Sequence, residues 1–155
     1  MKIALASDHA GYPLKQHLVD YLAKQGYEVL DLGVDNPNVS ADYPDAAQAV
    51  GAAVLDGRAE RGIVACGSGV GACIAANKIQ GIYAALVHDV YSAHQGVEHD
   101  QMNVICVGAR IIGTALAEEI ATTFLKAQFS GEERHARRFN KMLALESAAH
   151  RPTGS

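Results

Sequence analysis

The chain has no tryptophan, few other aromatic residues and no strong excess of either charge. Of its 155 residues, 6% are aromatic, and 13 basic residues against 17 acidic ones leave a formal net charge of −4. A mildly acidic chain has no overall field that attracts a polyanion, so we expect no nucleic-acid partner. No apolar run approaches the roughly 20 residues that span a bilayer, so we expect no membrane partner either.

Two further absences concern the termini and the thiols. The opening apolar run Met1–Leu5 is soon interrupted by charged residues, which predicts no secretion signal. Cys66, Cys73 and Cys106 are odd in number, which argues against a disulfide framework and for a reducing cytoplasm. Neither Cys-x-x-Cys nor His-x-x-x-His spacing occurs, so we expect no metal.

What the sequence does contain is a regular alternation of apolar strand-like runs with helix-like segments. This alternation predicts an α/β fold in one domain over residues 1–149, with a five-stranded parallel sheet covered by helices on both faces. Residues 150–155 are expected to form a frayed tail. The expected strands are 2–6, 28–32, 62–66, 82–87 and 104–107, and the expected helices are 12–25, 44–55, 72–79, 90–97, 114–127 and 132–149.

The ends of the expected strands carry much of the reactive chemistry of the chain. In open parallel sheets, binding sites form where the carboxyl ends of the strands meet. We therefore expect a site at this edge. The side chains that follow strand ends and could serve it are Asp8 and His9, Cys66 and Ser68, His88 and Asp89, and Arg110.

The most informative segment is Cys66–Gly71, which reads Cys-Gly-Ser-Gly-Val-Gly after a buried strand. Glycines allow a tight turn with inward N–H groups, and the helix that follows adds partial positive charge. Such a loop stabilises an anion or a negative charge that forms in a reaction, and favours the thiolate of Cys66. Cys66 is thus interpreted as functional, whereas Cys73 and Cys106 are interpreted as core residues.

The same loop has a rival interpretation. Gly67-x-Gly69-x-x-Ala72 fits a dinucleotide-binding fingerprint, and Asp89 lies about where a ribose-binding acid belongs. Against it, the motif follows the third strand rather than the first, and cofactor binding needs no thiol. The chain also has no room for a separate substrate domain.

Two charged segments also have two interpretations each. Glu98–Asp100, expected in a loop before the fifth strand, is either a solvated charge run or part of a site. Arg134 and Arg138, four residues apart at the start of the last helix, either face solvent or together clamp a phosphate. Asp45, just after Pro44, is interpreted as an early-helix acid.

The ordered motifs of residues 1–147 resemble those of the sugar-phosphate isomerase family that contains ribose-5-phosphate isomerase B and galactose-6-phosphate isomerase. No single motif decides the matter, but the ordered combination is highly specific. The matching stretches are Ser7–Gly11, Asp42–Pro44, Cys66–Gly71, Ala75–Lys78, Tyr91–Ala93, Glu98–His99, Asn103–Val104, Gly108–Arg110, and Arg134–His135 with Arg138.

The resemblance implies a Rossmann-like three-layer sandwich and a metal-free aldose–ketose isomerase without a cofactor, acting on ribose 5-phosphate and ribulose 5-phosphate. It also implies a homodimer, sometimes paired into a tetramer, with each active site shared between two chains. The helix of residues 132–149 would then cross to the partner.

Roles follow from the resemblance residue by residue. Cys66 would be the base, with Ser68 and the N–H groups of the loop cradling the enediolate. Asp8 and His99 would open the sugar ring and move hydroxyl protons. The expected binding residues are Gly67, Gly69, Val70 and Gly71 in the cradle, His9, Arg110, Arg134 and Arg138 at the phosphate, and Tyr43 along the sugar.

One position departs from the family pattern. Many relatives carry Asn after the histidine of the Glu98–His99 segment, and this chain carries Asp100. An ionised carboxylate accepts hydrogen bonds but cannot donate them. Tetrose and hexose phosphates therefore remain alternative substrates, and a sugar-phosphate sensor without turnover remains an alternative function.

Overall fold

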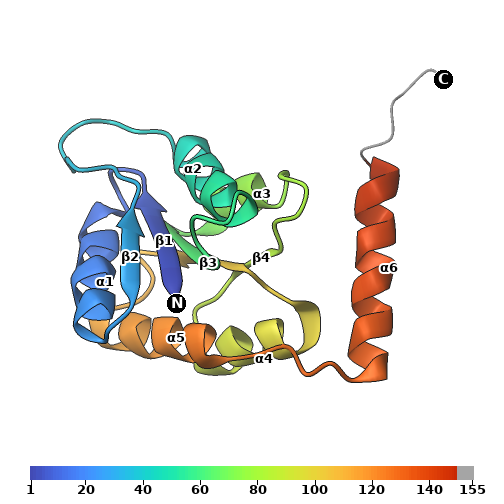
Figure 1. Cartoon of the computed structure of the whole chain (residues 1–155). Coiled ribbons are helices and arrows are strands. Elements are labelled where there is room, and N and C mark those ends of the chain that lie inside the picture. Colours follow the sequence, from blue (N-terminus) through green and yellow to red (C-terminus); the bar gives the residue numbers. More distant parts are fainter. Residues whose placement is uncertain (150–155) are drawn as a thin grey trace, which may run out of the picture.

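The computed structural model describes residues 1–149 of the chain. They form five strands and six helices that alternate along most of the sequence, as Figure 1 shows. In chain order the elements are β1 (Lys2–Ser7), α1 (Tyr12–Lys24), β2 (Glu28–Asp31), α2 (Tyr43–Leu55), β3 (Arg61–Cys66), α3 (Val70–Ala76), β4 (Ala84–Leu86), α4 (Val90–Asp100), β5 (Val104–Gly108), α5 (Thr114–Lys126) and α6 (Glu133–Ala149).

The predicted five-stranded parallel sheet is confirmed. Its strand order is β2-β1-β3-β5-β4, and every pairing is parallel. From β1 the chain builds β2 on one side of the sheet and then crosses to β3 on the other side. The connections after β1 and β3 therefore diverge at their carboxyl ends, where a crevice opens.

Helices cover both faces of the sheet, and the strands show why. Along β3, Ile63 and Ala65 belong to the core cluster that includes α1, α4 and α5. The alternate residues Val64 and Cys66 belong to the cluster that includes α2 and α3. A strand buried on both faces reads as a continuous apolar run, which is the pattern of the sequence. The Cys66 side chain thus lies on the α2 and α3 face.

Helix α6 is an exception to the layered arrangement, because it stands beside the sandwich rather than on the sheet (Figure 1). It packs mainly against α4 among the elements described. The Glu146 carboxylate accepts a hydrogen bond of 2.7 Å from the Gly81 N–H and one of 3.2 Å from the Tyr83 hydroxyl. These bonds tie the far half of α6 to the segment before β4.

The structure corrects two elements and leaves one expectation open. The helix expected over 72–79 runs Val70–Ala76 and ends where the Asn77 side chain bonds the Ala84 backbone instead. Glu98–Asp100 was expected in a loop, but it forms the last turn of α4, which runs to Asp100. The apolar positions Ala93 and Val97 continue a helical face past Gly96, and this continuity outweighs the loop-like charges. The expected tail, residues 150–155, lies outside the described residues. No helix within residues 1–149 is long and apolar enough to span a membrane.

Candidate active site

A cleft of about 410 Å³ opens at the carboxyl edge of the sheet, at the crevice between β1 and β3. Four separate connections contribute side chains to it. Its volume lies within the range of small-molecule sites. The cleft is lined by Asp8, His9, Ala10, Tyr43, Cys66, Gly67, Ser68, Gly71, Arg110 and Ile111. Eight of these residues were expected in the site from the sequence.

The Cys66 sulfur lies under the glycine-rich loop. Its side chain is 4% exposed, and the Gly69 N–H donates a hydrogen bond of 3.1 Å to the sulfur. Gly69 adopts a φ of 81°, a backbone conformation that favours glycine. An N–H group aimed at sulfur stabilises a thiolate more than a thiol, because the negative charge is a stronger acceptor.

The loop does not leave all its N–H groups for a ligand. The Gly69 N–H donates its hydrogen bond to Cys66, and the Val70 N–H donates a hydrogen bond of 3.2 Å to the Ser68 hydroxyl. The cradle expected over Gly67 to Gly71 is therefore reduced by two donors.

Asp8 reaches the cleft because the turn after β1 approaches β3 closely. Its carboxylate is 7% exposed and accepts a 2.8 Å hydrogen bond from the Gly11 N–H. A Cβ at Gly11 would lie 2.2 Å from the Ala65 carbonyl oxygen, so only glycine allows this approach. This close approach brings Asp8 to the cleft that Cys66 lines. No local pattern in the sequence marks Gly11 as the residue that permits it.

His9 and Arg110 bring nitrogen groups to the cleft. His9 Nδ1 lies 3.1 Å from the Ala41 nitrogen and 3.2 Å from the Ala41 carbonyl oxygen, so the Ala41 residue orients the ring whichever of the two contacts Nδ1 makes. Arg110 lies beside Gly67, whose carbonyl accepts a 3.0 Å hydrogen bond from the Arg110 N–H. Both groups suit an anionic part of a ligand.

Tyr43 closes the cleft from α2. A Cβ at Gly71 would lie 2.7 to 3.0 Å from three atoms of the Tyr43 ring, so the ring lies directly over this glycine. The ring remains 42% exposed at the rim. Asp45 lies in the first turn of α2, as expected, and does not line this cleft.

Six of the expected site residues do not line the cleft. Gly69 and Val70 belong to the glycine loop beside it, and the other four lie elsewhere on the chain. Helix α4 starts after β4 and ends before β5, so its last turn lies at the amino edge of the sheet. The five residues of β5 span about 17 Å, which separates this turn from the Cys66 cleft. The residues concerned are His99, Asp100, Arg134 and Arg138, none of which lines the cleft.

We name His99, His135, Arg134 and Arg138 the distal cluster. The rings of His99 and His135 stack with centroids 3.8 Å apart, which joins the end of α4 to the start of α6. Burial of the ring lowers the pKa of His135, and the neighbouring His99 and Arg134 lower it further. A neutral His135 leaves the positive charge of the cluster to the two exposed arginines, of which Arg134 pairs with Glu132 at 3.1 Å.

Two thiols next to the cleft form a pair that sequence reasoning did not anticipate. Cys106 is buried in β5, as expected, but Cys73 on α3 is only half-buried. A hydrogen bond from the Cys106 thiol lowers the pKa of Cys73 to about 7. The same contact, with burial, raises the pKa of Cys106. The site thus has a second ionisable thiol beside its glycine loop.

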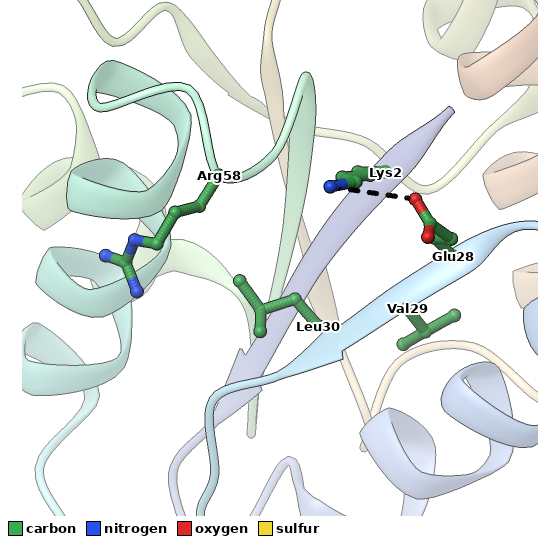
Figure 2. A pocket seen from close by; sticks show the side chains of 5 residues that line it. All are labelled: Lys2, Glu28, Val29, Leu30 and Arg58. Atoms are coloured by element: carbon green, nitrogen blue, oxygen red, sulfur yellow. Dashed lines mark ion pairs between the residues drawn. The ribbon is translucent and has the colours of Figure 1, made fainter.

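A different hollow lies at the edge strand β2, far from the glycine loop. Figure 2 shows the five residues that line it, which are Lys2, Glu28, Val29, Leu30 and Arg58. Lys2 and Glu28 form an ion pair at 3.9 Å between exposed side chains, while Arg58 pairs with Asp56 instead. Neither a nucleophile nor a buried acid lines this hollow, so the chemistry points to the Cys66 cleft. Among residues 1–149, no three His, Cys, Asp or Glu side chains group as a metal ion would require.

Known proteins of one family resemble this chain over most of its length. Residues 3–142 match the model of the Ribose/Galactose Isomerase family. The chain is 41% identical to Escherichia coli ribose-5-phosphate isomerase B over 94% of its own length and 96% of the relative's. It is 43% identical to a D-erythrulose-4-phosphate isomerase of Pectobacterium atrosepticum, over 84% and 86% of the two chains. The structure of Clostridium thermocellum ribose-5-phosphate isomerase B superposes with a TM-score of 0.92 at 46% identity, covering 96% of this chain and 99% of the other.

Proposed function

The chain belongs to the ribose/galactose isomerase family, and from this premise we propose that it interconverts D-ribose 5-phosphate and D-ribulose 5-phosphate through an enediolate, with Cys66 as the base. The observation that carries the proposal is the hydrogen bond that the Gly69 N–H donates to the buried Cys66 sulfur at the floor of the cleft. An N–H donor at this position stabilises negative charge on the sulfur that takes part in proton transfer.

The reaction moves one proton between two neighbouring carbons. The Cys66 thiolate removes the proton from C2 of the open-chain aldose, and the electron pair moves toward the carbonyl oxygen to form an enediolate. The same proton returns to C1, while a hydroxyl proton shifts between the two oxygens. Ser68 and the N–H groups still available in the loop stabilise the oxygen that becomes negative.

Asp8 and His99 are proposed to handle the hydroxyl protons, including the one that moves when the furanose ring opens. Asp8 is buried beside the sulfur, which suits proton transfer to a sugar hydroxyl. His99 belongs to the distal cluster and cannot reach the cleft of its own chain. It therefore acts, in this proposal, in the cleft of a second copy.

Phosphate binding is proposed to be divided in the same way. His9 and Arg110 line the cleft, while Arg134 and Arg138 of a second copy complete the clamp through α6. Exposed apolar side chains at the cleft's edge of the sheet support an interface there. They are Val70, Ile74, Leu86, Tyr91 and Ile111. The dimer, its possible pairing into a tetramer, and the shared site all belong to this proposal.

A four-carbon sugar phosphate is the second candidate substrate. It is favoured by the relative described as a D-erythrulose-4-phosphate isomerase and by Asp100, which stands where many relatives carry Asn. The nucleotide-binding alternative loses ground, since the Gly69 N–H is bound to Cys66 and the Tyr43 ring covers Gly71. A pyrophosphate would need that backbone free.

The test is isomerase activity of chelator-treated protein on ribose 5-phosphate, erythrulose 4-phosphate and a hexose 6-phosphate. We expect pentose turnover that Cys66→Ala lowers at least about 10³-fold while the variant still binds the sugar phosphate. Cys73→Ala, which removes the neighbouring thiol, is the matched control and keeps its turnover. Higher kcat/KM for the tetrose would reassign the substrate. Binding without turnover on any sugar would favour the sensor.

A further inference from the structure

We propose that His88, which no comparison assigns, is a positioning residue for the Cys66 site: it holds the peptide on which the glycine loop rests. The inference builds on the proposed role of Cys66. His88 follows the short edge strand β4 and is half-buried. It does not line the cleft, so it acts through the backbone rather than on substrate.

The first contact is a hydrogen bond to the last residue of β5. The Gly108 N–H donates 2.9 Å to His88 Nε2. One step earlier in the ladder, the Val87 N–H still donates to the Cys106 carbonyl at 3.1 Å. The His88 side chain thus supplies the acceptor at the point where the strand pairing ends. An acceptor at Nε2 requires the neutral ring with its proton on Nδ1.

The second contact is the packing of the glycine loop on this same peptide. A Cβ at Gly69 would lie 3.0 Å from the Val107 carbonyl carbon and 3.2 Å from Gly108 N. A Cβ at Gly108 would lie 2.7 Å from the Ser68 carbonyl oxygen. The loop and the end of β5 touch with no space between them, so a rotation of the Val107–Gly108 peptide must displace Ser68 and Gly69.

The third contact carries the displacement to the sulfur. The Gly69 N–H donates the 3.1 Å hydrogen bond to Cys66. The two residues after Gly108 also hold the loop. The Ala109 N–H donates a hydrogen bond of 2.9 Å to the Cys66 carbonyl, and the Arg110 N–H donates one of 3.0 Å to the Gly67 carbonyl. His88 therefore fixes both the donor that faces the sulfur and the strand end that supports it.

The test compares two variants that differ in the acceptor. Gln places an oxygen the same number of bonds from Cβ as Nε2, so His88→Gln keeps an acceptor. Phe fills similar space without one. We expect His88→Phe to lower kcat about ten- to hundredfold with KM within about twofold, since a small displacement of reacting groups is costly. His88→Gln is expected to keep kcat within about threefold of the parent protein.

Alkylation of Cys66 by iodoacetamide, followed by mass spectrometry of its peptide at neutral pH, gives a readout without substrate. We expect His88→Phe to slow it about tenfold and His88→Gln to preserve it, because thiolate content sets the rate. Cys73 in the same sample is the reference thiol. This measurement stands even if no sugar phosphate turns over, which separates failure of the inference from failure of the proposed function.

Two results would overturn the inference. One is that His88→Phe keeps both the Cys66 alkylation rate and the kcat of the parent protein. The other is equal impairment of both variants, which would assign His88 to packing alone. Urea unfolding verifies the fold of each variant. If His88→Phe does not fold, His88→Met, which is flexible and carries no nitrogen acceptor, replaces it under the same criteria.

Discussion

At the scale of single residues, the site depends on one glycine for its geometry. Gly69 combines a φ of 81° with contacts that leave no room for a side chain, because a Cβ would lie 2.6 Å from Leu86 Cδ1 and 3.0 Å from the Val107 carbonyl carbon. Its N–H is also the group that faces the Cys66 sulfur. Conformation, packing and proposed catalysis therefore meet in one backbone position.

Gly69→Ala is expected to lower kcat about hundredfold by turning this N–H away from the sulfur. Gly57→Ala is the matched control, because Gly57 has a φ of 83° and no atom near its would-be Cβ. Gly57→Ala adds only conformational strain, so it should lower the unfolding free energy by about 1 kcal/mol and leave kcat unchanged. Steady-state kinetics with urea unfolding of both variants checks this. Equal kinetic losses would show that strain, rather than the lost donor, is responsible.

The half-buried His88 and the buried His135 predict how stability depends on pH. Burial lowers the pKa of His88, with Asp89 opposing it, and burial followed by His99 lowers the pKa of His135. The folded protein then binds fewer protons than the unfolded chain below about pH 6.5, the ordinary histidine value. Stability is fully present above that pH and declines as the pH falls toward the folded-state pKa values.

Urea midpoints measured between about pH 7.5 and 5.5 should therefore decrease toward acid. His88→Gln removes one of the two titrating groups, so its decrease should be smaller than that of the parent. An identical decrease in the variant would contradict the assignment of a half-buried, neutral His88.

At the scale of elements, the connection between β2 and α2 is held by a lysine of α1. Lys15 is 1% exposed. Its Nζ donates a hydrogen bond of 2.9 Å to the Asp31 carboxylate and one of 2.8 Å to the Val34 carbonyl. This connection also carries Ala41, whose backbone orients His9 in the cleft. The buried Lys15 ammonium, paired with the partly exposed Asp31, thus links the packing of α1 to the geometry of the site.

Lys15→Met is expected to lower the unfolding free energy by about 1 to 3 kcal/mol, because it removes the donor to the Val34 carbonyl and the cation beside Asp31, which keeps its hydrogen bond from the Gly33 N–H. Lys24→Met, an exposed change in the last turn of the same helix, should cost less than about 0.5 kcal/mol. Urea unfolding of the two variants measures the difference. A similar loss of unfolding free energy in both variants would mean that Lys15 does not hold the connection.

At the scale of the whole molecule, the two groups of residues that the proposed site needs do not meet in one chain. The Cys66 cleft lies at the carboxyl edge of the sheet, and the distal cluster lies at the amino edge. If the chain acts as the proposed dimer, each complete site takes the cleft of one copy and the distal cluster of the other.

Mixed dimers test this division. Cys66→Ala and His99→Ala proteins are each expected to be nearly inactive, but a mixed dimer has one site with both residues intact. Unfolding and refolding an equal mixture should restore about a quarter of parental activity, since half the dimers are mixed and one of their two sites is complete. Cys66→Ala refolded with itself is the control. No recovery in a mixture shown to exchange subunits would place both residues in the same chain's site.

How much of this the sequence alone determined follows from the range of each interaction. Alternating apolar runs and helical faces depend on neighbours along the chain, so the strands, most helices and the parallel sheet were predicted. The Cys66 loop was found for the same reason, because its glycines and thiol are contiguous. Boundaries were less accurate: the helix expected over 72–79 runs Val70–Ala76, and α4 continues to Asp100, where three charged residues concealed the helix.

Contacts between distant segments were decided by the tertiary structure. The approach of Gly11 to Ala65, the Cys73–Cys106 thiol contact and the hydrogen bond from Gly108 to His88 each join residues far apart in sequence. No local pattern encodes such pairs, because they depend on strand order and on which face each side chain takes. The sequence by itself therefore determined which chemical groups the protein has, whereas only the folded sheet decided which of them meet in one chain.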